Sequence, residues 1–356
     1  MTSGSAAVSE PGRRAATFTG SRIAAVVACV PAATLTNDAL VERFGDAVAQ
    51  VTKMTGVESR HISPPDQTTS DLCAHAAEAL FEREGLARDR IDAVIFASQT
   101  PDYRLPATAC ELQHRLGLPA GIAAFDVNLG CSAYPYALWL AGMMIESGGL
   151  DRVLVLVGDT ISKIVHPEDR ATAMLFGDSG TATLVERADE ASPATFILGT
   201  DGSGARNLIV PEGAYRTGAP ADPRNANPGD TLFMEGGEIF NFTLKAVPKL
   251  LGDLLEAAQV PVDGVDAFLF HQANAFMIKH LAKKAKLPPE KVPVNIGRFG
   301  NTSSATIPLL LVTDCRDLVT RPGGAMLAML GFGVGYSWGG CATRVGPLRT
   351  AELVTI

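Results

Sequence analysis

One cysteine stands at a position where a thiol can act as a nucleophile. Cys131 occurs in the sequence Asn-Leu-Gly-Cys-Ser-Ala, after an apolar run typical of a strand and at the expected start of a helix. Backbone N–H groups and the helix dipole stabilise negative charge at such a place, which lowers the pKa of a thiol. We therefore interpret Cys131 as a candidate nucleophile. The alternative is a buried core cysteine.

Two further residues could act on the same chemistry. His271 ends an apolar run, Val265 to Phe270, and begins the sequence His-Gln-Ala-Asn. The carboxyl end of a strand, ahead of a helix, is where α/β folds place ligands. Asn301 lies in the sequence Gly-Asn-Thr-Ser-Ser-Ala. A structural histidine that has its hydrogen bonds satisfied is the alternative for His271 unless these residues meet in space.

An internal repeat predicts that they do meet. The turn at Cys131 resembles the turn at Asn301, 170 residues further along the chain. The strand-like runs after Asp92 and Asp266 are separated by 174 residues, and the runs that begin at Arg152 and Ala325 form a third pair in the same order. Repeats of this kind indicate duplicated structure. Two similar halves around a pseudo-twofold axis would bring both turns to one pocket, with His271 beside them.

The elements that position these residues predict an α/β protein. Short apolar runs alternate with helical patterns, which favours sheets covered by helices. The helix expected after Cys131 is apolar on nearly all sides and should be central and buried. We expect a disordered tail at 1–17, an N-terminal half at 18–190 with the cysteine, and a C-terminal half at 191–356 with the histidine and asparagine.

One segment interrupts the regular pattern. Thr200 to Gly237 is rich in Gly, Pro, Asn and Asp. A loop of this length inside a compact domain is usually a lid or a binding loop. A surface insertion without a role in binding is the alternative.

Composition excludes some functions. The 356 residues are 47% hydrophobic and 19% charged, with a net charge of −8. Nucleic-acid binding needs a basic surface and is not expected. No apolar stretch reaches the ~20 residues of a membrane helix. The six cysteines include no CxxC pair, which is typical of a reducing, cytoplasmic compartment.

The motifs around Cys131, His271 and Asn301 resemble the active-site motifs of β-ketoacyl-[acyl-carrier-protein] synthase III, in the thiolase superfamily. The similarity runs from about Arg22 to about Arg344. Other stretches agree with it: Thr55-Gly56-Val57 with Arg60, Pro167-Glu168-Asp169-Arg170, Leu175-Phe176-Gly177-Asp178 and Gly333-Val334-Gly335-Tyr336-Ser337-Trp338-Gly339. The resemblance implies a thiolase-like fold, in which two pseudo-repeated βα halves form mixed sheets in an αβαβα layered arrangement.

The resemblance also implies a mechanism. Cys131 takes an acyl group as a thioester, which divides one hard step into two easier ones. A malonyl or other acyl thioester then condenses with it by decarboxylative Claisen chemistry. His271 and Asn301 donate hydrogen bonds to the developing enolate, and each such donor contributes about 3 kcal/mol. The backbone N–H groups of Cys131 and Val334 form a second oxyanion hole.

Substrates and partners follow from the same resemblance. Acyl-carrier protein and coenzyme A thioesters are the expected substrates, no metal or organic cofactor is implied, and a homodimer is typical of the family. Residues matched to substrate or carrier binding are Arg170, Asn274, Phe276, Lys279 and Lys283. Lys286 continues the same helical face, although a solvated face with no partner is the alternative.

Three positions depart from the pattern of family members that are primed by acyl-CoA. Gln50 and Met54 stand where such members usually carry tryptophan and arginine, and Phe276 stands where an arginine often helps to dock the carrier. The departures favour a specialised polyketide or fatty-acyl pathway over acetyl-CoA priming. Acyl transfer to an alcohol or amine, a cysteine hydrolase and an inactive partner of a condensing enzyme remain alternatives.

Overall fold

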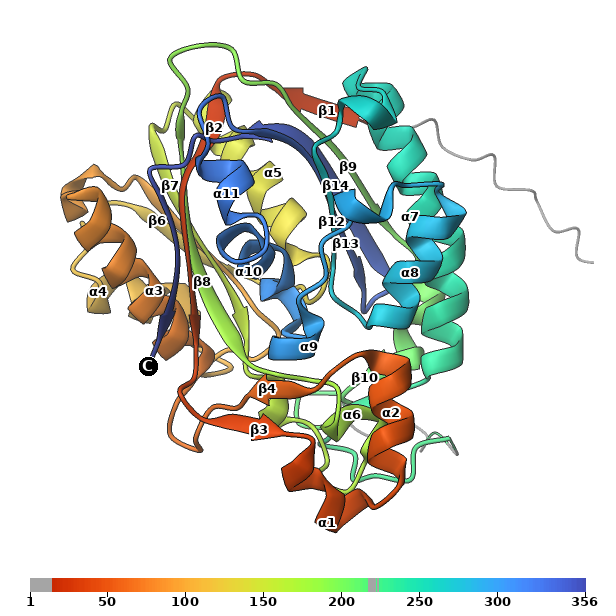
Figure 1. The fold of residues 1–356 in the computed structure, drawn as a ribbon. Coiled ribbons are helices and arrows are strands. Elements are labelled where there is room, and N and C mark those ends of the chain that lie inside the picture. The colour runs from red at the N-terminus through yellow and green to blue at the C-terminus, as the bar shows by residue number, and fades with distance from the viewer. Residues whose placement is uncertain (1–14, 217–221, 223) are drawn as a thin grey trace, which may run out of the picture.

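Two large β-sheets lie face to face in the computed structural model, which describes residues 15–216, 222 and 224–356 (Figure 1). The first sheet is mixed, because β15, β2, β5, β6 and β7 form parallel pairs while β8 pairs antiparallel with β2 and β7. Its strands, in spatial order, are β15 (Thr350–Thr355), β2 (Ser21–Val30), β8 (Ser179–Arg187), β7 (Arg152–Asp159), β5 (Ala93–Ala97) and β6 (Ala123–Val127).

The second sheet has five strands and is mixed as well. Only β12 and β13 pair in parallel. Its order is β1 (Ala15–Phe18), β9 (Ala194–Thr200), β14 (Ser337–Val345), β13 (Ala325–Gly333) and β12 (Ala267–Phe270). Two short pairs complete the strands: β3 (Thr34–Thr36) with β4 (Ser59–His61), and β10 (Leu208–Ile209) with β11 (Phe233–Met234).

Helices form the other three layers. α5 (Ala133–Glu146) and α10 (Thr306–Val312) lie between the sheets, α3 (Thr69–Glu84) and α4 (Thr108–Arg115) cover the outer face of the six-stranded sheet, and α7 (Gly236–Ala258) and α8 (Ala275–Lys284) cover the outer face of the other (Figure 1). The predicted αβαβα arrangement is confirmed. The shorter helices are α1 (Val41–Phe44), α2 (Ala47–Thr55), α6 (Arg170–Ala173), α9 (Ile296–Phe299) and α11 (Arg316–Thr320).

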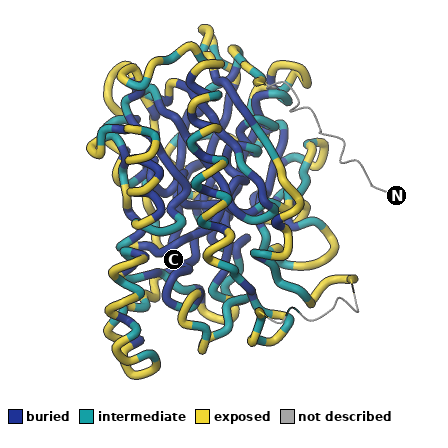
Figure 2. The backbone as a smooth tube through the Cα atoms, turned by 90° about the vertical axis from the view of Figure 1, so that its right-hand side faces the viewer, coloured by how far each residue is buried: buried dark blue, intermediate teal, exposed yellow. Residues whose placement is uncertain are grey.

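The sandwich explains why the strands are apolar at every position. In β5, Ala93, Ile95 and Ala97 face the central helices, whereas Val94 and Phe96 face α3 and α4. Successive side chains point to opposite faces of a sheet, and here both faces are covered. Figure 2 shows the result: the interior strands and helices are buried, and most exposed residues lie on the outer helices, the loops and the edge strands.

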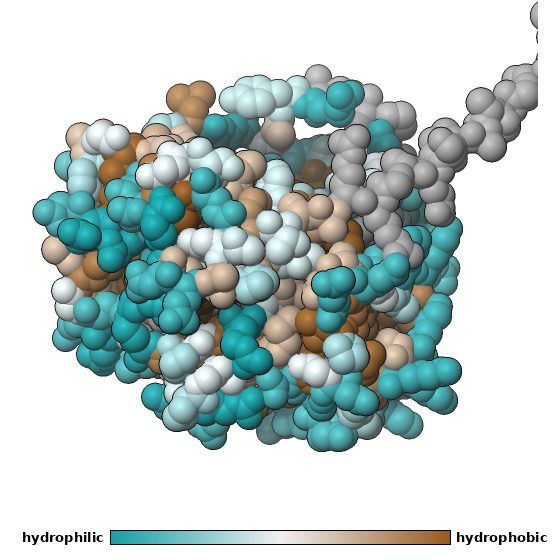
Figure 3. Space-filling view, turned by 90° about the horizontal axis from the view of Figure 1, so that it is seen from above, coloured by the Kyte–Doolittle hydropathy of each residue, from teal (hydrophilic) through white to brown (hydrophobic). Residues whose placement is uncertain are grey.

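The outer surface is mixed in character. The face seen in Figure 3 carries hydrophobic side chains in small areas between hydrophilic ones, which is ordinary for a folded protein. Among the described residues, no helix combines the length and the hydropathy that crossing a bilayer would require.

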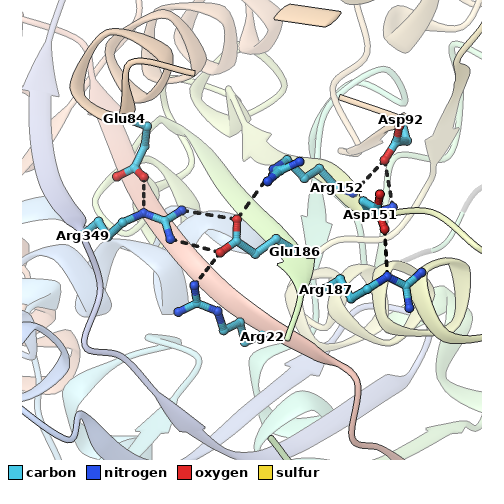
Figure 4. A network of polar contacts seen from close by, with 8 residues as sticks. All are labelled: Arg22, Glu84, Asp92, Asp151, Arg152, Glu186, Arg187 and Arg349. Atoms are coloured by element: carbon cyan, nitrogen blue, oxygen red, sulfur yellow. Dashed lines mark hydrogen bonds and ion pairs between the residues drawn. The ribbon is translucent and has the colours of Figure 1, made fainter. Parts of the chain in front are cut away.

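A cluster of charges fixes the C-terminal strand to the first sheet. Glu186, near the end of β8, is only 7% exposed, and Figure 4 shows arginines from β2, from β7 and from the residue before β15 around it. Its carboxylate lies 2.6 Å from Arg22, 3.0 Å from Arg349 and 3.7 Å from Arg152. Although burial alone would raise it, Arg349 and the other two arginines hold the pKa of Glu186 below its usual value.

The termini differ from the expected division of the chain. Of the tail predicted at 1–17, residues 1–14 lie outside the described residues. Ala15–Thr17 belong to β1, which pairs with β9, so the prediction of disorder is wrong for these three residues. Phe18 packs on Phe196 with ring centroids 5.7 Å apart. The two large sheets exchange terminal strands across the predicted boundary at 190/191. β1 from the N-terminal side pairs with β9 in the second sheet, and β15 from the C-terminal side pairs with β2 in the first. The division into two halves therefore stays a prediction.

The repeat is imperfect in the second half. The pairs β5 with β12 and β7 with β13 lie where the sequence predicted strands. Val294 to Ile296, the partner of the β6 sequence, forms no strand. The N–H of Asn295 instead donates to Oε1 of Gln272 at 3.1 Å, so this segment bonds to a side chain and not to a sheet.

Candidate active site

Cys131 lies between β6 and α5, in contact with the backbone of β13. The helix itself begins at Ala133, so Cys131 precedes it by two residues. A Cβ at Gly333 would lie 2.8 Å from Cβ of Cys131, and one at Gly331 would lie 2.7 Å from its carbonyl oxygen. Real Cβ atoms do not approach so closely, and glycine is therefore needed at both positions.

The thiol is protonated in this environment. Cys131 is 8% exposed, and burial raises its pKa to about 12. The hydroxyl of Ser303, 3.9 Å from Sγ, lowers the pKa, the Asp159 carboxylate raises it, and the backbone N–H groups of Val334 and Cys131 lower it. The predicted lowering of the pKa is wrong, because desolvation of a thiolate outweighs the hydrogen bonds.

His271 follows β12 and is fixed from two sides. Its N–H donates to the carbonyl of Leu330 on β13 at 2.8 Å, and its ring meets Phe332 edge-on at 5.5 Å. Nδ1 lies 2.8 Å from Oγ1 of Thr306, which leaves Nε2 as the nitrogen that can face a substrate. The side chain is 1% exposed, and burial lowers its pKa to about 3. The imidazole is therefore neutral at physiological pH.

Asn301 is held in the turn before α10. Its N–H donates to the carbonyl of Leu175 at 2.9 Å, and its carbonyl accepts from the N–H of Gly177 at 3.1 Å. The side-chain Oδ1 accepts from the N–H of Ser303 at 2.9 Å. Because Oδ1 is engaged, the Nδ2 amide is the group that can donate to a ligand.

Two cavities meet at Cys131. A small one of about 80 Å³ is lined by Cys131, His271, Asn301 and Asn274. A larger one of about 920 Å³ includes Cys131, Ser303 and Val334. The three predicted catalytic residues thus share one cavity, and Val334 lines the second.

The segment from Thr200 to Gly237 contributes to both cavities. Leu208 lines both, and Val210 and Leu232 line the larger one. β10 and β11 pair within this segment, so its described part is built into the site as a wall. Residues 217–221 and 223 of the predicted loop lie outside the described residues.

Of the five residues matched to carrier or substrate binding, Asn274 lines a cavity of the site and the other four do not. Asn274 caps α8, where its Oδ1 accepts from the N–H of Met277 at 2.7 Å, and it lines the small cavity. Phe276 is 49% exposed and stacks on Phe240 with ring centroids 5.8 Å apart. Lys279 and Lys283 are exposed on the same helix. Arg170, at the start of α6, is exposed and lines neither cavity.

Three residues of the site were not predicted from the sequence. Thr306 holds the ring of His271, Ser303 contacts the thiol, and Asp159 lies buried near both. The two hydroxyls belong to the Asn301 motif, so their presence was visible but their direction was not. Asp159 is a lone carboxylate at the end of an apolar run, which is a sequence signal for a buried polar role. Within the described ranges, no group of His, Cys, Asp and Glu could hold a metal ion.

Comparisons with known proteins agree with this geometry. The family "3-oxoacyl-[acyl-carrier-protein (ACP)] synthase III" matches residues 125–202, and its C-terminal family matches residues 255–345. The β-ketoacyl-[acyl-carrier-protein] synthase III of Xanthomonas campestris pv. campestris is 36% identical over 328 residues, which cover 91% of this chain and 98% of that protein.

Solved structures give the same result. The 3-oxoacyl-(acyl-carrier protein) synthase from Burkholderia xenovorans LB400 has a TM-score of 0.94 and 52% identity, over 97% of this chain and 99% of that one. The priming β-ketosynthase from the R1128 polyketide biosynthetic pathway has a TM-score of 0.81 and 28% identity, over 95% and 100%.

The fold and these relatives define a thiolase-like condensing enzyme of the acyltransferase class. The chain belongs to the β-ketoacyl-[acyl-carrier-protein] synthase III family, as its motifs predicted. The predicted enzyme class is confirmed, and the alternative of an inactive structural partner is not.

Burial of neutral His271 predicts a specific loss of stability in acid. The folded pKa, about 3, lies below the unfolded value of about 6.5, so the unfolded chain binds the proton first and stability falls as pH drops below 6.5. Between pH 7 and pH 5 this group should account for about 2 kcal/mol. Urea unfolding at both pH values should show a smaller loss in His271→Gln than in wild type. Equal losses in the two proteins would contradict the neutral, buried assignment.

Proposed function

We propose that Cys131 carries the acyl group as a thioester and that His271 and Asn301 stabilise the enolate that attacks it. The observation that supports this proposal is the meeting of these three side chains in one buried cavity. The backbone N–H groups of Cys131 and Val334 lower the pKa of the thiol, as donors near the sulfur would. Donors held in place before the reaction stabilise charge that develops only in the transition state.

The first step is transfer of the acyl group to the enzyme. Sγ of Cys131 attacks the carbonyl carbon of an acyl thioester, the bond to the donor sulfur breaks, and the thiol proton leaves on that sulfur. The N–H groups of Cys131 and Val334 bind the carbonyl oxygen as it becomes negative. Because the resting thiol is neutral, it loses its proton in this step and not before.

The second step is condensation. A malonyl thioester loses carbon dioxide, and its thioester oxygen becomes an enolate. In the resting site the Thr306 hydroxyl donates to the carbonyl of Ser303 at 3.1 Å. When it turns to donate to Nδ1 of His271 instead, Nε2–H is free to donate to the enolate oxygen, together with Nδ2 of Asn301. The enolate carbon then attacks the acyl carbon, and the sulfur of Cys131 leaves. The proposed steps need no metal ion or organic cofactor, and this stays a prediction.

Loading and condensation should separate in variants. Cys131→Ala should form no adduct and no condensed product, as measured by intact mass after mixing with an acyl thioester. His271→Ala and Asn301→Ala should still form the adduct, but each should release carbon dioxide from a malonyl thioester about 10²–10³ times more slowly.

Two results would contradict the proposal. Turnover by Cys131→Ala would remove the nucleophile from its role. Free acid as the only product would indicate a hydrolase, and an ester or amide formed without release of carbon dioxide would indicate acyl transfer to an alcohol or amine.

The larger cavity supports an acyl group bigger than acetyl. Its volume of about 920 Å³ is in the range of pockets for drug-sized ligands. Its lining combines polar residues with a set of apolar side chains: Ile161, Ile164, Phe176, Leu208, Val210 and Leu232. We propose that an apolar acyl chain of medium or greater length lies there while it is attached to Cys131.

A bulkier wall should shorten the preferred chain. Val210→Trp should reduce adduct formation from a decanoyl thioester by about tenfold and leave the acetyl thioester unchanged. Val165→Trp is a matched control, because this half-buried valine does not line the cavity. Equal loss with both donors would show that the cavity does not hold the chain.

The exposed face of α8 supports a dock for an acidic carrier protein. Its N-cap, Asn274, lines the small cavity that Cys131, His271 and Asn301 share, so this helix lies beside the site. Lys279 and Lys283 lie on its exposed side, and no ion pair to either is found among the described residues. Complementary charge speeds association with an acidic partner. Phe276 and Met54 add exposed apolar area nearby.

Reversal of these charges should weaken carrier binding alone. Lys279→Glu/Lys283→Glu should raise KM for a carrier-linked thioester by about tenfold at low salt, with kcat unchanged. A short thioester of N-acetylcysteamine should react as before. Arg90→Glu/Arg316→Glu makes the same change of net charge on other helices and serves as the control. An equal rise in KM in the control would assign the effect to net charge.

The wider setting remains a proposal. The departures at Gln50, Met54 and Phe276 and the priming β-ketosynthase among the relatives support a specialised polyketide or fatty-acyl pathway. The free outer edge of β6 supports a homodimer whose sheet continues across the interface. The six free cysteines fit a cytoplasmic location. Arg170 stays a predicted substrate contact.

A further inference from the structure

A buried carboxylate that the proposed steps do not use lies beside the nucleophile. Asp159 is the last residue of β7 and is 0% exposed. The groups that favour its charged form are hydroxyls and backbone N–H groups, with no basic side chain of the described residues among them. A buried carboxylate is costly unless donors satisfy it, so its retention here needs a reason.

The two carboxylate oxygens bind two different turns. Oδ1 accepts from the N–H of Gln99 at 2.7 Å, the hydroxyl of Ser98 at 3.1 Å and that of Thr100 at 3.4 Å. Oδ2 accepts from the hydroxyl of Ser304 at 2.6 Å and from its N–H at 3.3 Å. The first turn follows β5 of the six-stranded sheet, and the second is the Asn301 turn before α10.

Both turns touch the site of Cys131. A Cβ at Gly130 would lie 2.1 Å from Oε1 of Gln99, so this side chain packs on the residue before the nucleophile. On the other side, the hydroxyl of Ser303 lies 3.9 Å from the sulfur.

Ser303 needs support from its neighbours. Its φ of 50° is in the left-handed region, which is unfavourable for a residue with a Cβ and persists only where the surroundings hold it. The bond from its N–H to Asn301 holds it on one side, and Ser304, which bonds to Asp159, holds it on the other.

We infer that Asp159 is a positioning residue, whose carboxylate joins the two turns that flank Cys131 and holds the hydroxyl of Ser303 against the sulfur. The inference deepens the proposed function and rests on the role given there to Cys131. No atom of Asp159 contacts the reacting groups. It acts through the hydroxyls of Ser303 and Ser304, which both favour its charged form, and through the Ser98–Thr100 turn.

The charge of Asp159 has a separate and measurable effect. The carboxylate disfavours the thiolate and so contributes to the raised pKa of Cys131. The other titratable groups around the cluster are His271 from β12, Cys73 from α3 and Asp102 from the loop after β5. Of these, His271 is neutral, and the burial of Cys73 keeps it a thiol.

Asp159→Asn should therefore change two properties in opposite directions. Alkylation of Cys131 by iodoacetamide at pH 8, followed by mass spectrometry, should become about three to ten times faster, because a nearby negative charge is removed. Condensation by the acylated enzyme should become at least about tenfold slower, because an amide cannot accept from every donor that the carboxylate holds.

Two variants separate position from charge and from stability. Ser304→Ala removes the shorter of the two bonds from Ser304 to Asp159, leaves the longer one from its N–H and keeps the charge. Condensation should therefore slow by about tenfold while the pH dependence of alkylation stays that of wild type. Asp178→Asn is the matched control. Asp178 is also 0% exposed and accepts from Ser63 and Ser162, but it is not among the groups that act on the thiol.

The outcomes distinguish this inference from the proposed function. If Asp159→Asn and Asp178→Asn lose stability alike and alkylation is unchanged in both, Asp159 is merely structural and the inference is overturned. If Asp159→Asn does not fold, condensation by Ser304→Ala at the wild-type rate overturns it. Turnover by Cys131→Ala would instead refute the proposed function, because alkylation reports on the thiol whatever its role.

Discussion

The contact between the backbone of β13 and Cys131 is the constraint on which the rest of the site depends. β13 belongs to the five-stranded sheet, and Cys131 follows β6 of the other sheet. Glycine at 331 and 333 removes the side chains that would separate them. The same strand accepts the N–H of His271 at Leu330. Close packing at one point of β13 thus sets the positions of both Cys131 and His271, and a larger residue there would displace them together.

Close packing also decides protonation. Cys131 and His271 are both buried, and both are neutral because a charge without a nearby counter-charge is unfavourable in such a place. The resting site is therefore not a thiolate–imidazolium pair. Under the proposed mechanism, Nδ2 of Asn301 and the N–H groups of Cys131 and Val334 donate to charge that exists only while a substrate reacts. Burial strengthens these interactions, so the feature that suppresses the free thiolate also favours the charged transition state.

The sequence alone predicted four of the strands and the three residues of the candidate site, because residue type and order are enough to show them. Apolar runs located β5, β7, β12 and β13, and the motifs located Cys131, His271 and Asn301. The direction of the pKa of Cys131 was wrong, because a helix start is visible in a sequence whereas the degree of burial is not. The β1 strand was missed because Ala15–Phe18 is too short to show alternation, and its pairing depends on β9, which lies far along the chain. The support from Thr306 and Asp159 depends on side-chain direction, which motif spacing leaves open.

The imperfect repeat gives the physical reason for the division of roles between the halves. After Cys131 the chain continues into α5, a helix of 14 residues, whereas after Asn301 it passes through Ser303 with a positive φ before α10 begins. That extra bend lets Thr306 reach the ring of His271. The sequence before it forms no strand because Asn295 bonds to Gln272, the residue next to His271. The second half thus departs from strict duplication around the histidine, where a second copy of the Cys131 turn would leave the imidazole without its partner.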